Sequence, residues 1–154
     1  MVVNIKLDSL ADTEKLAEII ANNVFKGMVI GLTGDLGSGK TTFTKFFAKK
    51  IGIKDTLNSP TFTIFKIYEG DLDLYHMDVY RLENSPYDYE LDEYIFGSGI
   101  SVIEWYEYIK NMLPETILEI KISVSEQDES RDVVIKGEGR YEKIVEAINN
   151  RYCN

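Results

Sequence analysis

The sequence predicts an α/β protein with a P-loop NTPase-like three-layer fold, whose mixed sheet has a parallel core and antiparallel additions. Residues 28–33 are apolar, residues 34–41 form a glycine-rich run that ends in Lys-Thr, and a segment of helical periodicity follows. A strand, a glycine-rich loop and a helix in this order are the context that a phosphate-binding loop requires. A short apolar run at 100–103 predicts a second buried parallel strand, and two further pairs of strand-like segments predict the antiparallel additions.

The first elements follow from apolar periodicity and from cap residues. Residues 2–7 alternate weakly, as a strand at a sheet edge does. Ser9 and Asp12 are rival N-caps for the helix that follows. Gly52 is placed to end the helix after the glycine-rich run. The apolar faces comprise Leu16, Ile19, Ile20 and Val24 in the first helix and Phe43, Phe46 and Phe47 in the second.

The remainder of the chain predicts two hairpins, one buried strand and three helical segments. The first hairpin turns at residues 69–71, Glu-Gly-Asp, and Pro114 ends one of the helices. In chain order, the expected elements are a hairpin of 62–68 and 72–80, a short helix around 89–96, a strand at 100–103, a helix at 106–113, a hairpin of 116–124 and 132–136, and a helix at 142–152.

The run Gly34-Asp-Leu-Gly-Ser-Gly-Lys-Thr41 has the spacing of a loop that cradles phosphate. Its glycines allow the backbone to turn tightly and to point successive N–H groups inward at a helix N-terminus. Lys40 would reach the β- and γ-phosphates of a nucleotide, and the hydroxyl of Thr41 would ligate Mg²⁺. A glycine-rich surface turn is the alternative, which the strand–helix context disfavours. We therefore expect the chain to bind a nucleoside triphosphate.

A P-loop also needs a carboxylate at the C-terminal edge of a nearby strand, to hold Mg²⁺ or to orient the attacking water. Asp78 and Glu104 are the two candidates. Glu104 is favoured because it closes a buried apolar strand. The alternative for either residue is an acid that only caps a strand end in solvent.

Several other positions have both a functional and a structural interpretation. Ser59 and Thr61 follow the P-loop helix and form either a switch-like loop that orders around the γ-phosphate or a proline-initiated turn. Trp105 packs either at the nucleotide site or, by default, in the core. His76 is the single histidine and is expected to be structural. The tyrosine-rich segment 75–108 favours a solvated acidic face over a partner surface.

Composition limits the class of protein. With 154 residues and 44% apolar content, the chain suits a single P-loop NTPase domain over residues 1–154. A net charge of −9 argues against direct nucleic-acid binding, because phosphate contacts require clustered Lys and Arg. Cys153 cannot form an internal disulfide, since it is the single cysteine. The lack of a secretion signal and of a long apolar run predicts a cytoplasmic protein that does not enter the membrane.

Arginine is scarce, which bears on the type of phosphate chemistry. The four arginines are Arg81, Arg131, Arg140 and Arg151. Kinases usually clamp two anionic substrates with several arginines, so a small-molecule or protein kinase remains only the alternative function. Arg81 is the one arginine near the motifs that could act as a finger on the γ-phosphate, so slow turnover is expected.

Four segments together resemble a single family. They are residues 34–43 (Gly-Asp-Leu-Gly-Ser-Gly-Lys-Thr-Thr-Phe), 59–62 (Ser-Pro-Thr-Phe), 76–81 (His-Met-Asp-Val-Tyr-Arg) and 103–105 (Ile-Glu-Trp). In this order and spacing they resemble the bacterial tRNA threonylcarbamoyladenosine-biosynthesis ATPases called TsaE, formerly YjeE. The P-loop alone would be generic, and the other three segments make the match specific. The last hairpin and helix carry no signature.

The resemblance implies a weak, Mg²⁺-dependent ATPase that binds a threonylcarbamoyl transferase subunit and its pseudo-enzyme partner. It implies that tRNA is met only indirectly, through that complex. ATP would support threonylcarbamoyladenosine modification at position 37 of tRNAs that read ANN codons. The preference for ATP also rests on the resemblance, since no residue clearly reads the base.

Carried over by position, the resemblance gives each motif residue a role. The implied catalytic residues are Lys40, Asp78 and Glu104, and the implied metal ligands are Thr41 and Glu104. The implied nucleotide-binding residues are Gly34, Asp35, Leu36, Gly37, Ser38, Gly39, Lys40, Thr41, Thr42 and Trp105. Ser59 and Thr61 would belong to the switch-like loop.

Overall fold

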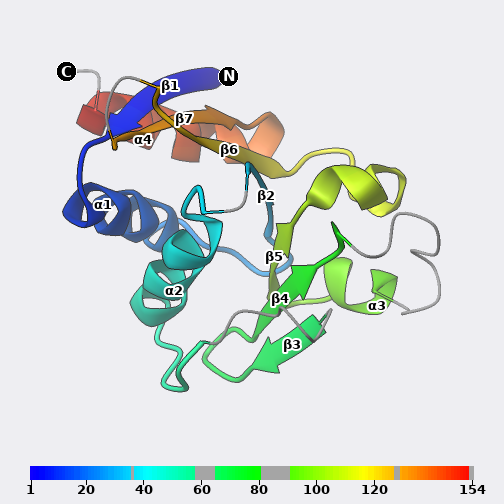
Figure 1. The fold of residues 1–154 in the computed structure, drawn as a ribbon. Coiled ribbons are helices and arrows are strands. Elements are labelled where there is room, and N and C mark those ends of the chain that lie inside the picture. The colour runs from blue at the N-terminus through cyan, green and yellow to red at the C-terminus, as the bar shows by residue number, and fades with distance from the viewer. Residues whose placement is uncertain (36, 58–64, 81–90, 127–128, 153–154) are drawn as a thin grey trace.

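The computed structural model describes residues 1–35, 37–57, 65–80, 91–126 and 129–152. Within these residues the strands form one seven-stranded sheet (Figure 1). The strands are β1 (Val2–Leu7), β2 (Val29–Thr33), β3 (Phe65–Tyr68), β4 (Leu74–Asp78), β5 (Ile100–Glu104), β6 (Leu118–Val124) and β7 (Arg131–Lys136). The helices are α1 (Leu10–Ala21), α2 (Lys40–Lys50), α3 (Asp92–Ile95) and α4 (Glu142–Tyr152), with 3₁₀ segments η3 (Tyr106–Met112) and η4 (Gly139–Tyr141).

The sheet has a parallel core with antiparallel strands at both sides. Its strand order is β1-β7-β6-β2-β5-β4-β3. β2 pairs in parallel with β5 and β6, and β4 pairs in parallel with β5. The pairs β1–β7, β6–β7 and β3–β4 are antiparallel. The predicted fold class is therefore confirmed, and β1 lies at the sheet edge as expected. Because parallel strands end at one edge, the loops after β2, β4 and β5 meet there.

Each face of the sheet has its own apolar core. Ile30 and Leu32 of β2 belong to the larger core, to which α1, α2 and α4 contribute. Val29 belongs to a smaller core that includes residues of α3 and η3. This alternation follows from the two-residue period of a strand. The helices thus form layers on both sides of the sheet, as Figure 1 shows.

Most expected elements are present, and most differences lie at their ends. Ser9, rather than Asp12, caps α1, because its Oγ accepts a hydrogen bond from the Asp12 N–H at 3.3 Å. Gly52 follows α2 with a φ of 91°, as predicted. The short helix expected around 89–96 is α3 in the described residues, whereas residues 62–64 and 89–90 of the expected elements lie outside them.

The segment expected as a helix at 106–113 is the 3₁₀ helix η3, with an irregular backbone at Ile109. A 3₁₀ helix has three residues per turn, so Tyr106 and Ile109 lie on one side, and both are buried. A Cβ on Gly31 would lie 2.6 Å from Cγ of Tyr106, so the tyrosine ring packs directly on the sheet. None of the helices in the described part of the chain has the length and apolarity needed to cross a bilayer.

Candidate nucleotide-binding site

The predicted phosphate-binding loop connects β2 to α2 (Figure 1). Gly34, Gly37 and Gly39 have φ values of 144°, 80° and 113°, which L side chains rarely adopt. At Gly34 a Cβ would lie only 2.1 Å from the carbonyl oxygen of Ile122 in β6. The loop therefore requires glycine there on two grounds, conformation and space. Leu36 of the expected loop lies outside the described residues.

The polar groups at the start of α2 are available to an anion. Gly39 is the N-cap and α2 has no side-chain cap, so its first N–H groups resemble those that bind phosphate in other helices. Thr41 and Thr42 lie in this first turn and are partly exposed. Ser38 is buried, and its Oγ has no hydrogen-bond partner among the described residues.

Lys40 folds back over the loop that precedes it. Its Nζ donates to the carbonyl oxygen of Gly34 and lies 3.5 Å from the carbonyl oxygen of Asp35. The same Nζ lies 4.0 Å from the centre of the Trp105 ring. Burial lowers the pKa of Lys40, while the negative charges of Glu104 and then Asp78 act in the opposite direction. A buried ammonium thus lies beside the loop, among carboxylates that attract it.

The two candidate acids lie at the same edge of the sheet as the loop. Asp78 and Glu104 end β4 and β5 and are direct partners in the parallel register, so they share one face. Glu104 is also the register partner of Leu32, one residue before the end of β2. Burial, and to a lesser degree Glu104, raise the pKa of Asp78, while the Tyr80 N–H and Lys40 counteract this.

His76 is a neighbour of the site, although a single histidine on a strand was expected to be structural. Its Nε2 lies 2.7 Å from Oε2 of Glu104, and both side chains are buried. Its Nδ1 has no partner among the described residues. The signal was present in the sequence, because His76 and Asp78 are two residues apart on one strand and must share a face.

Trp105 connects the acidic edge to an aromatic cluster, so its expected default place in the core does not describe it fully. It has a φ of 63°, the one positive value for a non-glycine residue in the described ranges. The backbone N–H of Trp105 donates to the carbonyl oxygen of Leu32 at 2.8 Å. Its ring lies 5.0 Å from that of Tyr80 and 6.2 Å from that of Tyr108. Trp105 therefore covers Lys40 while it turns the chain sharply into η3.

Arg131 is a second neighbour of the loop that no motif indicated. It begins β7, and its Nε donates to the carbonyl oxygen of Ser38 at 2.8 Å. Its Nη2 lies 3.4 Å from the carbonyl oxygen of Gly37. Other positions of interest, Arg81 and the switch-like Ser59 and Thr61, lie outside the described residues, so their predicted roles stay predictions.

Comparison with known proteins decides the family. A family profile described as "Threonylcarbamoyl adenosine biosynthesis protein TsaE" matches residues 7–133. The chain belongs to the TsaE family. The tRNA threonylcarbamoyladenosine biosynthesis protein TsaE of Bacillus subtilis is 46% identical over 140 residues, which cover 90% of this chain and 88% of that relative. The protein of the same name from Treponema pallidum is 38% identical over 129 residues, or 82% of this chain and 95% of that relative.

The likeness to TsaE-family proteins extends to a solved structure. A crystal structure of Bacillus subtilis YdiB superposes with a TM-score of 0.81 at 37% sequence identity. The superposition covers 98% of this chain and 96% of that chain. It therefore includes the last hairpin and helix, for which the motifs gave no signature, and it agrees with the P-loop NTPase-like fold.

The side chains around the loop of this TsaE-family chain suit Mg²⁺. This ion prefers oxygen ligands and takes few of them from the protein when phosphates supply the rest. Thr41, Asp78 and Glu104 offer hydroxyl and carboxylate oxygens near the loop. Across the described ranges, no three or more His, Cys, Asp or Glu side chains are grouped so as to hold a metal by themselves. The donor set thus fits an ion that binds together with phosphate oxygens.

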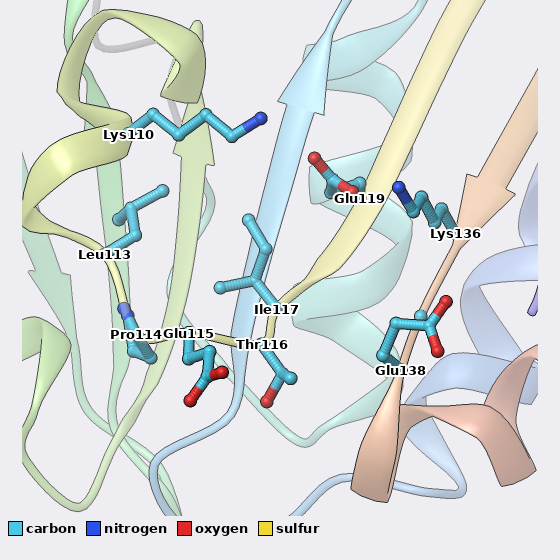
Figure 2. Close-up of a pocket in the computed structure, with 10 residues that line it drawn as sticks. Lys110, Leu113, Pro114, Glu115, Thr116, Ile117, Glu119, Lys136 and Glu138 are labelled. Atoms are coloured by element: carbon cyan, nitrogen blue, oxygen red, sulfur yellow. The ribbon is translucent and has the colours of Figure 1, made fainter.

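A hollow of about 340 Å³ lies apart from the P-loop. Figure 2 shows Lys110 and Lys136 extending from opposite sides toward Glu119. Oε1 of Glu119 accepts a hydrogen bond from the Tyr106 hydroxyl at 2.9 Å. The hollow lies beside the start of β6, whereas the P-loop follows the end of β2, which runs parallel to β6. This hollow is therefore not part of the nucleotide site.

Proposed function

We propose that this TsaE-family chain is a Mg²⁺-dependent ATPase of low intrinsic turnover that serves tRNA threonylcarbamoyladenosine biosynthesis. Family membership and the names of its relatives support the pathway. One observation supports the chemistry: Lys40, Asp78 and Glu104 lie together where the parallel strands end beside the glycine-rich loop. Hydrolysis of a nucleoside triphosphate requires a cation and backbone donors that bind the phosphates, and carboxylates that serve Mg²⁺ and the attacking water.

Phosphate binding is the first task of this site. The loop N–H groups and the Lys40 ammonium would bind the phosphates of ATP, and Lys40 would exchange its bond to the Gly34 carbonyl for one to phosphate. Thr41 and Glu104 would hold Mg²⁺. When bound, this ion would neutralise negative charge on the phosphate oxygens. Trp105, over Lys40, would exclude water from one side of the site.

Hydrolysis would then depend on the acidic pair. Asp78 and Glu104 would orient a water molecule toward the γ-phosphorus. The water oxygen forms a bond to phosphorus as the bond from phosphorus to the bridging oxygen breaks. ADP leaves, and the proton lost by the water ends on inorganic phosphate. Turnover by the chain alone is expected to be slow. Arg81 is the one arginine near the motifs, and among the described arginines Arg131 is engaged with loop carbonyls and Arg140 lies over the Phe25 ring.

The proposed partners are a threonylcarbamoyl transferase subunit and its pseudo-enzyme partner. A net charge of −9 supports contact with proteins rather than a direct grip on tRNA. ATP bound at the loop would govern association with that complex and so allow repeated rounds of tRNA modification.

The test measures ADP formation by the chain with Mg²⁺ and ATP alone, with the transferase complex, and with a panel of small-molecule acceptors. Co-purification with the complex, with and without ATP, is measured in parallel. We expect slow hydrolysis alone, faster hydrolysis with the complex, and association that depends on ATP. Turnover that depends on a small-molecule acceptor, without any response to the complex, would instead identify a kinase.

A further inference from the structure

The outer side of the P-loop rests on the β6–β7 hairpin. The Ser125 N–H donates to the Ser130 carbonyl oxygen at 2.9 Å, which closes the hairpin just before Arg131. Toward the end of β6, the carbonyl of Ile122 lies against Gly34. At the start of β7, the guanidinium of Arg131 reaches the carbonyls of Ser38 and Gly37. Two adjacent strands therefore support the loop at both of its ends.

The contact to Ser38 determines how one peptide group of the loop is oriented. A trans peptide is planar, and its C=O and N–H point in opposite directions. The described residues contain no cis peptide bond. Since the Ser38 carbonyl accepts from Arg131, the Gly39 N–H points away from Arg131. The contact between Arg131 and the Ser38 carbonyl therefore sets the direction of the Gly39 N–H, which belongs to the same peptide group. The Ser38 N–H belongs to the preceding peptide group and donates to the Asp35 carbonyl oxygen at 3.1 Å.

The charge of Arg131 adds to this geometric effect. A guanidinium remains charged at all physiological pH values and can donate to two acceptors from a rigid fork. A charged donor on a carbonyl also polarises the peptide, which makes its N–H a stronger donor to an anion. Nη1 of the same guanidinium donates to the Glu129 carbonyl oxygen, which fixes the side chain to its own hairpin.

Two cations thus hold the carbonyls of one loop. Lys40 binds those of Gly34 and Asp35, and Arg131 binds those of Ser38 and Gly37. If Lys40 moves to phosphate when a nucleotide binds, Arg131 is the cation that continues to hold the loop. We propose that Arg131 is a positioning residue, which keeps the P-loop in its anion-binding conformation before a nucleotide arrives and so couples the β6–β7 hairpin to nucleotide affinity.

This inference rests on the proposed function, in that the anion is the phosphate of a nucleotide. The experiment compares the wild-type protein with Arg131→Gln, Arg131→Lys and the control Arg151→Gln, which removes an exposed arginine from α4. Amide hydrogen exchange of residues 34–40 is measured without nucleotide. ADP affinity is measured by the fluorescence of Trp105, the single tryptophan.

We expect Arg131→Gln to speed exchange of residues 34–40 at least about fivefold and to weaken ADP binding about tenfold. Arg131→Lys keeps the charge but cannot span both carbonyls, so both effects should be intermediate. Arg151→Gln should change neither, and exchange in α4 should be the same in all Arg131 variants. Unchanged exchange in Arg131→Gln would overturn the inference, even with weaker ADP binding, because Arg131 would then act on the nucleotide directly.

Two further controls keep the outcome clear. Circular dichroism checks that each variant folds, and if Arg131→Gln does not, Arg131→Lys carries the test. A lysine variant with wild-type exchange and affinity would then overturn the inference. If the wild-type protein itself binds no ADP or ATP, the proposed function fails, while the exchange comparison still tests the role of Arg131.

Discussion

His76 Nε2 lies 2.7 Å from Glu104 Oε2, and this contact joins two buried side chains on neighbouring parallel strands. The bond fixes one oxygen of the carboxylate that ends β5, beside the P-loop. It also keeps Glu104 on the sheet face that Asp78 shares. The acid proposed to act on water is therefore held by a neighbour within the fold before any nucleotide binds.

The first prediction concerns Glu104 itself. Glu104→Gln keeps the size of the side chain but removes its charge, so we expect ATP hydrolysis to fall at least about tenfold with nucleotide affinity nearly unchanged. The matched control is Glu107→Gln, which removes an exposed carboxylate whose negative charge also raises the pKa of Lys40. Steady-state hydrolysis and calorimetric titration measure the two effects. Normal hydrolysis by Glu104→Gln would remove this residue from the mechanism.

The second prediction concerns His76. His76→Leu leaves a buried carboxylate without its donor, which should cost about 1–3 kcal/mol in the free energy of unfolding. We also expect kcat to fall about tenfold while KM changes little, because Glu104 loses its orientation. His76→Gln places an amide donor near the position of Nε2 and should recover much of kcat. If both variants have equal kcat and differ only in stability, His76 is structural, as the sequence suggested.

The third prediction is a dependence of stability on pH at Asp78. Its pKa is raised in the folded state, chiefly by burial, so between the unfolded and folded pKa values the folded protein binds more protons. The contribution of Asp78 to the free energy of unfolding therefore falls as pH rises through that window. Asp78→Asn should raise Tm at neutral pH, and the gain should shrink as pH is lowered toward about 4. A gain that is constant with pH would contradict this.

The fourth prediction separates two glycines of the loop. Gly37→Ala introduces a Cβ at positive φ with nothing within 4 Å, which should cost about 1–2 kcal/mol. Gly34 also has a positive φ, of 144°, and Gly34→Ala brings its Cβ against the Ile122 carbonyl as well, so its cost should be clearly larger. Urea unfolding without nucleotide measures both. Equal losses would mean that β6 does not press on the loop.

Much of the fold was predictable because its signals are local. The P-loop glycines and the buried strand before them are each specified within a few residues, and the cap of α1 was narrowed to Ser9 or Asp12 in the same way. That Asp78 and Glu104 lie beside the loop was expected from the carboxylate that a P-loop needs. The parallel pairing of β4 with β5 that brings them together depends on strand order, because residues 72–80 were expected only as part of an antiparallel hairpin. The 3₁₀ form of η3 has no such local signal, and its residue Tyr106 packs over Gly31 from another strand.

The contacts that orient the site depend on register and strand order instead. His76 and Glu104 are 28 positions apart, and Arg131 is 93 positions from Ser38. Arg131 reaches the loop only because β7 lies beside β6, which lies beside β2. Its target is a backbone carbonyl, a group that every residue has, so no residue pattern marks the pair.

The most direct test of the account is the affinity of Mg²⁺-ATP for Lys40→Met, compared with Lys45→Met as an exposed control from the same helix. Calorimetry is suitable because Lys40 lies over Trp105 and would disturb its fluorescence. Tm is measured for both variants without nucleotide, so that a loss of binding is not confused with a loss of folding. We predict wild-type affinity for Lys45→Met and an affinity about a hundredfold weaker or more for Lys40→Met. Equal binding by all three proteins would contradict the assignment of this loop as the phosphate site.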